Sequence, residues 1–170
     1  MKQHDLMPTF INGDRIILKV ISPNDETEIQ KIVTFHQDNS RFIDRYIGSS
    51  HFKKYNAAKI FITEDYKQFL NNTSFNYYVY LKDDDNTLIG KVFFEKNLDV
   101  NNALYGFYYL GVDFRGKKYI QEAYKYIMPF FKNANFKQIV LTIDETNIAS
   151  VKTAQSIGFN LIQNHYIKTL

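Results

Sequence analysis

The sequence predicts a mixed α/β fold, in which a central twisted mixed β-sheet carries helices on both faces. Runs of β-branched and aromatic residues alternate with amphipathic segments in the order β-α-α-β-β-β-α-β-α-β. The 170 residues suffice for one ordinary domain with a substantial core. No Gly/Ser linker, repeat or low-complexity tail divides them. We therefore expect residues 1–170 to form a single domain.

The first strand is expected at residues 15–21, a β-branched run that ends at Ser22 and Pro23. Serine can cap a helix and proline fits its first turn, so a helix should follow. That helix carries early acidic residues and then an apolar stripe, which consists of Ile29, Ile32, Val33 and Phe35. A second helix with acids at its start is expected at residues 64–71, after a break at residues 48–50.

A hairpin is expected next, because strand-like residues 75–81 and 88–95 flank a polar turn. The three aspartates of that turn match no calcium-loop spacing and are interpreted as solvated. The remaining predicted elements are an aromatic strand at 104–112, a helix at 116–132, a strand at 136–143, a helix at 148–157 and a final extended segment at 159–170. Pro129 should weaken the last turn of the third helix, and Gly158 should close the fourth.

Composition excludes several classes of function. The chain has no cysteine, so thiol nucleophiles, thiolate zinc sites and disulfides are absent, and its four histidines lack metal-ligand spacing. No apolar run approaches the roughly 20 residues of a membrane span, and the first residues do not resemble a signal peptide, so we expect a cytoplasmic protein. A net charge of +3 is too weak to indicate a nucleic-acid surface. The 16% of aromatic residues is interpreted as core and strand packing.

Two segments carry candidate chemistry. In the first, an aromatic strand runs through Arg115, Gly116, Lys117 and Lys118 directly into a helix. A helix start offers unpaired N–H groups and the positive end of the helix dipole, and glycine lets an anion approach the backbone. A phosphate cradle and a solvated basic helix start both fit these residues.

The second segment follows the strand at 136–143. Asn147 is a good N-cap, and an apolar face follows, made of Ile148, Val151, Ala154 and Ile157. Structure alone explains most of this pattern. The two segments become specific only together, through their separation and their order among the strands.

In this combination the sequence resembles the GNAT superfamily of acyl-CoA N-acyltransferases, especially the branch of ribosomal-protein N-terminal acetyltransferases. The resemblance covers nearly the whole chain. It rests on residues 13–19, 86–90, 114–119, 147–150 and 156–159.

The resemblance implies an acetyl-CoA site without a metal. The pyrophosphate would lie on backbone N–H groups of Arg115, Gly116, Lys117, Lys118, Tyr119 and Ile120. The pantetheine arm would follow Leu110, Gly111 and Val112, where two parallel strands splay apart. The side chains of Asn147 and Ser150 would reach the pantetheine and the thioester, and Ser150 is the candidate general acid for the departing thiolate.

Four positions depart from the family pattern. Lys118 and Ile120 replace small residues of the usual Arg-Gly-x-Gly-x-Ala/Gly loop, and both replacements are expected to weaken CoA binding. The strand position that often carries a glutamate base falls on Leu104 or Tyr105, so Tyr105 is a second catalytic candidate. Ala154 occupies the position of a tyrosine acid found in other branches.

A site without a carboxylate base suits an amine of low pKa, such as an α-amine near 7.7–8.0. The sequence therefore predicts an N-acetyltransferase that moves the acetyl group of acetyl-CoA to a peptide N-terminus or a small primary amine, by direct attack in a ternary complex. The alternative is a catalytically degenerate acyl-CoA-binding or interaction module on the same fold. A ribosome- or RNA-associated protein is disfavoured by the weak charge. A monomer or a homodimer is expected, without membrane attachment.

Overall fold

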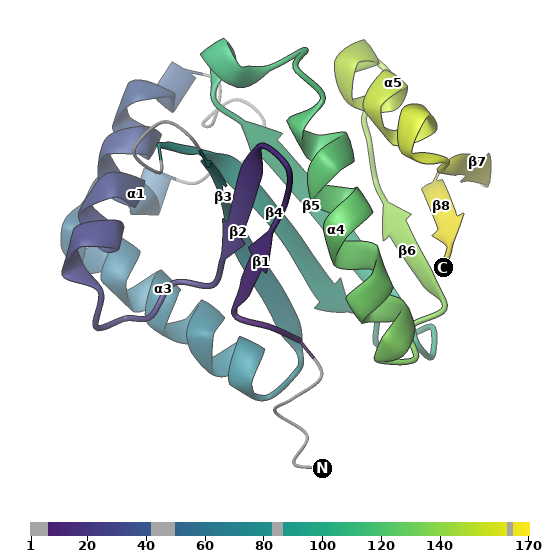
Figure 1. Cartoon of the computed structure of the whole chain (residues 1–170), viewed down its shortest axis with the longest axis horizontal. Helices are drawn as coiled ribbons and strands as arrows, with labels where there is room; N and C mark the ends of the chain where they lie inside the picture. Colours follow the sequence, from purple (N-terminus) through teal and green to yellow (C-terminus); the bar gives the residue numbers. More distant parts are fainter. Residues whose placement is uncertain (1–6, 42–49, 83–86, 163–164) are drawn as a thin grey trace.

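A computed structural model describes residues 7–41, 50–82, 87–162 and 165–170. Its eight strands form one sheet in the order β1-β2-β3-β4-β5-β6-β8-β7 (Figure 1). The strands are β1 (Phe10–Asn12), β2 (Ile16–Lys19), β3 (Ser74–Leu81), β4 (Leu88–Lys96), β5 (Ala103–Leu110), β6 (Gln138–Leu141), β7 (Asn160–Ile162) and β8 (His165–Thr169). The helices are α1 (Glu26–Asp38), α3 (Tyr55–Leu70), α4 (Tyr119–Asn133) and α5 (Ile148–Ile157), with short 3-10 helices η2 (Ser50–Lys53) and η3 (Val112–Phe114).

The sheet is mixed, as the sequence predicts. Every described strand pair is antiparallel except β5 and β6, which run parallel. Parallel neighbours need a crossover connection, and α4 supplies it here. The predicted hairpin is confirmed as β3 and β4, while residues 83–86 of its turn lie outside the described residues.

Helices cover both faces of the sheet, and two cores result. The larger core joins α4 and α5 to inward-facing strand residues, and its aromatic centre consists of Phe75, Phe94, Tyr124, Phe131 and Phe136. The second core joins α1 and α3 to the other face through residues such as Ile32, Ile62 and Tyr80. Most of the aromatic residues therefore pack in cores, as expected from composition.

Several element boundaries differ from the prediction. A short strand, β1, precedes the expected first strand and pairs with it. Helix α3 begins at Tyr55, well before residue 64, so its acids lie mid-helix. The missing signal is a cap, because Lys54 at the N-cap makes no side-chain bond to the helix. Residues 48–49 of the predicted break lie outside the described residues.

The second half shows three further differences. Helix α4 starts at Tyr119 rather than at residue 116, and it continues past Pro129 to Asn133. Strand β5 ends at Leu110, and β6 is shorter at both ends than predicted. The final extended segment is two antiparallel strands, β7 and β8. By contrast, α5 has the predicted bounds. No helix among the described residues is long and apolar enough to span a membrane.

Candidate functional site

A cavity opens where β5 and β6 separate. Their pairing ends at Gly106 and Leu141, while β5 continues to Leu110 without a partner on that side. The space has a volume of about 410 Å³ and lies among β5, the segment after β6, and the beginnings of α4 and α5. It is lined by Gly106, Phe107, Tyr108, Tyr109, Leu110, Arg115, Gly116, Lys118, Tyr119, Ile120, Gln121, Leu141, Thr142, Ile143, Asp144, Asn147, Ala149, Ser150 and Thr153.

Two helix N-termini converge on this cavity. Helix α4 begins beside it, and no side chain at its N-cap satisfies the first-turn N–H groups. Helix α5 is capped as predicted, because the side-chain Oδ1 of Asn147 accepts the N–H of Ser150 at 3.2 Å. Unpaired N–H groups and a helix dipole favour an anion, so the α4 end is the better phosphate site.

The loop before α4 has the backbone of a glycine-rich turn although one glycine is replaced. Gly116 (φ 72°) and Lys118 (φ 64°) both adopt the left-handed conformation that glycine favours. These two residues cannot belong to a right-handed helix, which is why α4 starts at Tyr119. The Lys118 replacement thus preserves the loop geometry at the cost of backbone strain. Ile120, the other departure, is only 4% exposed and belongs to the larger core.

We expect Lys118→Gly to raise the free energy of unfolding by about 1 kcal/mol, because glycine removes the left-handed strain. Its affinity for CoA should equal or exceed that of the original chain. Urea unfolding and calorimetry with CoA measure the two effects. Lys118→Ala is the matched control, since it removes the charge but keeps the strained backbone. If both variants bind CoA more weakly to the same extent, the lysine charge outweighs the backbone geometry.

An ion pair ties this loop to the edge of the sheet. Glu122, in the first turn of α4, is 7% exposed and accepts the backbone N–H of Arg15 at 2.7 Å and of Ile16 at 3.3 Å. It also accepts Arg15 Nε at 2.7 Å, while Arg15 Nη1 donates to the carbonyl of Lys117 at 3.1 Å. A trans peptide plane then turns the N–H of Lys118 away from Arg15.

The predicted cofactor residues divide into two groups. Those that line the cavity are Leu110, Arg115, Gly116, Lys118, Tyr119, Ile120, Asn147 and Ser150. Gly111, Val112 and Lys117 lie outside its lining. The N–H of Gly111 donates to the carbonyl of Ile89, and the carbonyl of Lys117 accepts from Arg15. The N–H of Val112 donates to Asn39 Oδ1 at 3.1 Å. The guanidinium of Arg115 donates to the carbonyl of Leu110 at 3.2 Å, on the unpaired stretch of β5.

The polar groups of the cavity have different chemical capacities. Tyr108 donates its hydroxyl to the backbone carbonyl of Ser150 at 3.0 Å and so fastens α5 to β5. Burial raises the pKa of Tyr108 to about 12, so this hydroxyl stays protonated at neutral pH. Hydrogen bonds from Thr146 lower the pKa of Asp144, which makes it a weak base. The hydroxyl of Thr153 donates to the carbonyl of Ala149, whereas Ser150, the predicted acid, lines the cavity one turn earlier on α5.

The hydroxyl of Tyr109 is hydrogen-bonded to a buried histidine, His36. His36 Nδ1 lies 2.8 Å from the carbonyl of Ile32, so Nδ1 carries the proton and Nε2 accepts the Tyr109 hydroxyl at 2.9 Å. Burial lowers the pKa of His36 to about 4, and nearby Lys91 and Lys53 act in the same direction. The imidazole is therefore neutral at physiological pH and fixes the Tyr109 ring in place.

This histidine should make stability depend on pH. Between about pH 6.5 and 4 the unfolded chain binds a proton on His36 that the native protein does not bind, so the free energy of unfolding falls as pH falls. The loss should reach about 3 kcal/mol near pH 4. Urea unfolding across this range measures it. His36→Gln, which offers an amide donor and acceptor, should have a flatter profile; an equally steep one would contradict the assignment.

Sequence reasoning missed the part of the cavity lining at the end of β6 and just after it, which consists of Leu141, Thr142, Ile143 and Asp144. The available signal was the parallel pairing of two strands that are distant in sequence, which places the end of β6 beside β5. Tyr105, the second catalytic candidate, is 40% exposed and does not line the cavity. Ala154 is fully buried in the larger core. Within the described residues, no three His, Asp or Glu side chains are placed to hold a metal ion.

Comparison with known proteins gives a family match and several similar folds. A family model described as an acetyltransferase (GNAT) domain matches residues 15–160. The chain is similar to RimL, a ribosomal L7/L12 α-N-protein acetyltransferase in complex with coenzyme A (TM-score 0.81, 13% identity, 95% of this chain and 98% of that one). It is also similar to a ribosomal-protein-S5-alanine acetyltransferase from Vibrio fischeri (0.79, 17%, 96% and 96%).

A third similar structure is the microcin C7 self-immunity acetyltransferase MccE in complex with acetyl-CoA and AMP, with a TM-score of 0.78 and 21% identity over 97% of this chain and 98% of that one. No curated protein matches the sequence. These structures are all less than 25% identical to the chain, so their likeness concerns the fold.

Proposed function

The chain belongs to the acetyltransferase (GNAT) domain family, and from this membership we propose that it transfers the acetyl group of acetyl-CoA to a primary amine. The observation that carries the proposal is the cavity at the separation of β5 and β6, on which the N-termini of α4 and α5 converge. Such a site offers N–H groups for phosphates at one end and an unpaired strand edge for an amide-bearing arm.

Each part of acetyl-CoA has a matching surface in this proposal. The pyrophosphate binds at the start of α4, beside Gly116 and Lys118, where adding a Cβ to Gly116 would meet nothing within 4 Å. The pantetheine arm follows β5 from Leu110 toward Gly106, and its amides exchange hydrogen bonds with the strand. The thioester then lies near Gly106 and Ser150. Asn147 contributes mainly by capping α5, which holds Ser150 in position.

The proposed reaction is direct acyl transfer in a ternary complex. The lone pair of a neutral amine forms a C–N bond with the thioester carbon, and the C–S bond breaks. Ser150 donates its hydroxyl proton to the departing sulfur and recovers one from the nitrogen through water, so that the products are an amide and CoA thiol. Among the described residues, Ser150 Oγ has no hydrogen-bond partner, while the backbone N–H of Ser150 donates to Asn147 and its carbonyl accepts from Tyr108.

The acceptor is proposed to be an amine that is appreciably neutral near pH 7. Asp144 contributes a carboxylate to the cavity lining, and hydrogen bonds from Thr146 lower the pKa of this group. A carboxylate with a lowered pKa is a weak base and assists proton removal poorly. An α-amine with a pKa near 7.7–8.0 is largely able to react without a base. A lysine amine, with a pKa near 10.4, would need its pKa lowered by about three units to be equally neutral at pH 7. Two of the similar structures are named for ribosomal proteins and one for self-immunity, so both peptide and small-molecule amines belong in the test.

The test is release of free thiol when the purified protein is mixed with acetyl-CoA and a panel of peptide and small-molecule amines. We expect release that requires both acetyl-CoA and an amine. Calorimetry with CoA is run on the same protein. Binding of CoA without thiol release from any amine would overturn the proposed reaction and favour a binding module.

A further inference from the structure

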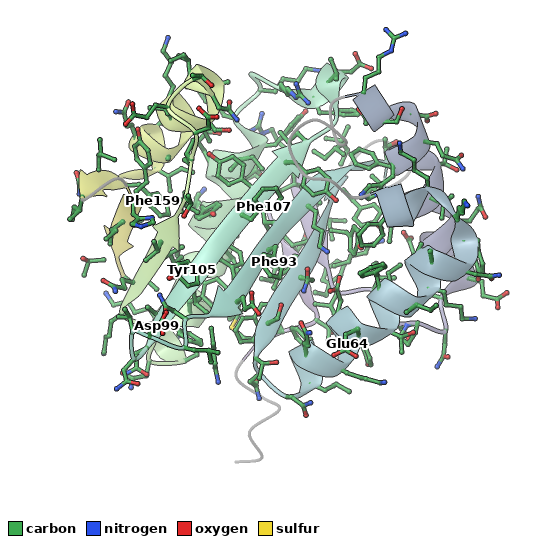
Figure 2. All side chains as sticks on the ribbon, turned by 180° about the vertical axis from the view of Figure 1, so that it is seen from behind. Glu64, Phe93, Asp99, Tyr105, Phe107 and Phe159 are labelled. Carbon is green, nitrogen blue, oxygen red and sulfur yellow. The ribbon has the colours of Figure 1, made fainter. Side chains whose placement is uncertain are left out.

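One face of the sheet beside the cavity carries exposed aromatic residues. Tyr105 and Phe107 on β5 are 40% and 37% exposed, and Phe93 on β4 is half-buried. Figure 2 shows these three residues on strands that no helix covers, with α3 to one side. Phe93 and Phe107 are opposite each other in the β4–β5 pairing, so their rings form one surface.

The apolar surface continues across the next strands. Val140 on β6 is the register partner of Tyr105, and Ile167 on β8 is the partner of Val140. Val140 is only 6% exposed and Ile167 is half-buried, so the exposed part of this surface consists of the aromatic rings. We call Phe93, Tyr105 and Phe107 the aromatic face. Contiguous exposed apolar residues on a soluble protein commonly mark a binding surface.

A carboxylate lies at the edge of this surface. Glu95 on β4 is exposed and is the register partner of Tyr105, so the two side chains point to the same side of the sheet. Directly opposed Cβ atoms in antiparallel strands are about 4.5–5.5 Å apart. Among the described residues, the side chain of Glu95 has no ion-pair or hydrogen-bond partner. Its charge is thus available to a ligand that carries a cation.

The aromatic face and the cavity meet at Phe107. Its ring belongs to the exposed surface, yet the residue also lines the cavity at the strand separation. The cavity lies among the N-termini of α4 and α5 at the strand separation, and it is lined by the consecutive β5 residues 106–110. A molecule on the aromatic face that reaches Phe107 would therefore lie beside the proposed thioester position near Gly106.

We propose that the aromatic face binds the acceptor, and that the acceptor is a primary amine with an aromatic or large apolar group close to its nitrogen. This assignment rests on the proposed acetyl transfer. The apolar group packs on Tyr105 and Phe107, and Glu95 attracts the ammonium form. The ammonium loses one proton to solvent, and the neutral amine that remains beside Glu95 attacks the thioester.

The experiment compares amines that differ in the group beside the nitrogen. One arm uses 2-phenylethylamine against ethanolamine, and the other uses a peptide amide that begins with phenylalanine against one that begins with serine. We expect kcat/KM to be at least about tenfold higher for the phenyl-bearing member, as apolar contacts discriminate by 10–200-fold. The arm with the larger kcat/KM identifies whether the amine is a peptide or a small molecule. Equal values within both arms would overturn the inference.

Variants separate the two parts of the proposal. Tyr105→Ala should remove most of the phenyl preference, and Glu95→Gln should lower kcat/KM for all amines at least tenfold and shift the pH profile. Neither should change the calorimetric affinity for acetyl-CoA. Phe10→Ala, an exposed aromatic on β1, and Glu26→Gln, an exposed acid on α1, are matched controls expected to leave both quantities unchanged.

Two outcomes distinguish the proposals. If thiol is released but Tyr105→Ala and Glu95→Gln behave like the controls, acetyl transfer stands and the acceptor assignment is wrong. If no amine releases thiol from the original chain, the proposed function fails and the acceptor assignment fails with it.

Discussion

Replacement of Glu122 by alanine is expected to lower the free energy of unfolding by about 2–4 kcal/mol. The change leaves the backbone N–H groups of Arg15 and Ile16 without their acceptor in a mostly buried position. Each unsatisfied buried donor costs roughly 1–3 kcal/mol. The lost charge partner adds less, because the Arg15 side chain is half exposed. Urea unfolding at pH 7 measures the effect.

The same change should weaken CoA binding in whatever fraction remains folded, because Arg15 would no longer hold the carbonyl of Lys117 in a fixed direction. Glu122→Gln keeps one oxygen for the backbone donors and should have a smaller effect on stability. Asp14→Asn is the control: Asp14 also ties this turn to α4 through Lys125, but both residues are exposed, so the loss of stability should be much smaller than for Glu122→Ala. Equal losses for Glu122→Ala and Asp14→Asn would contradict this account.

Replacement of Ser150 by alanine is expected to lower kcat by about 100-fold while the affinity for acetyl-CoA stays within a few-fold. A proton donor to the departing thiolate acts chiefly in the transition state, and general acids contribute typically 10²–10⁴-fold. The backbone N–H of Ser150 still donates to Asn147 in the variant, so the helix start should remain intact. Steady-state kinetics with an active amine and calorimetry with acetyl-CoA measure the two quantities.

Ser156→Ala is the matched control for this experiment. Ser156 lies on the same helix, but its hydroxyl donates to the carbonyl of Thr153 and it does not line the cavity. Its removal should leave kcat unchanged. A Ser150→Ala enzyme with the kcat of the original chain would remove Ser150 from the mechanism and leave bound water as the proton donor.

The sequence was sufficient where local chemistry decides structure. Helix α5 has its predicted bounds because Asn147 caps its start and Gly158, at φ 91°, ends it in the left-handed conformation. The β3–β4 hairpin was predicted because two strand-like runs flank a short polar turn. The motifs around Arg115 and Asn147 were visible in the sequence for the same reason: each belongs to a single helix start.

Only the tertiary structure decided the features that join distant parts of the chain. The ion pair between Arg15 and Glu122 connects residues 107 positions apart, and neither residue carried a functional signal alone. The parallel pairing of β5 with β6 ends at Gly106 and so creates the cavity, although no local pattern marks where two strands separate. Register across β4 and β5 places Glu95 beside Tyr105. The physical reason is that composition and periodicity report which face of an element is apolar, whereas contacts between elements depend on how those faces pack together.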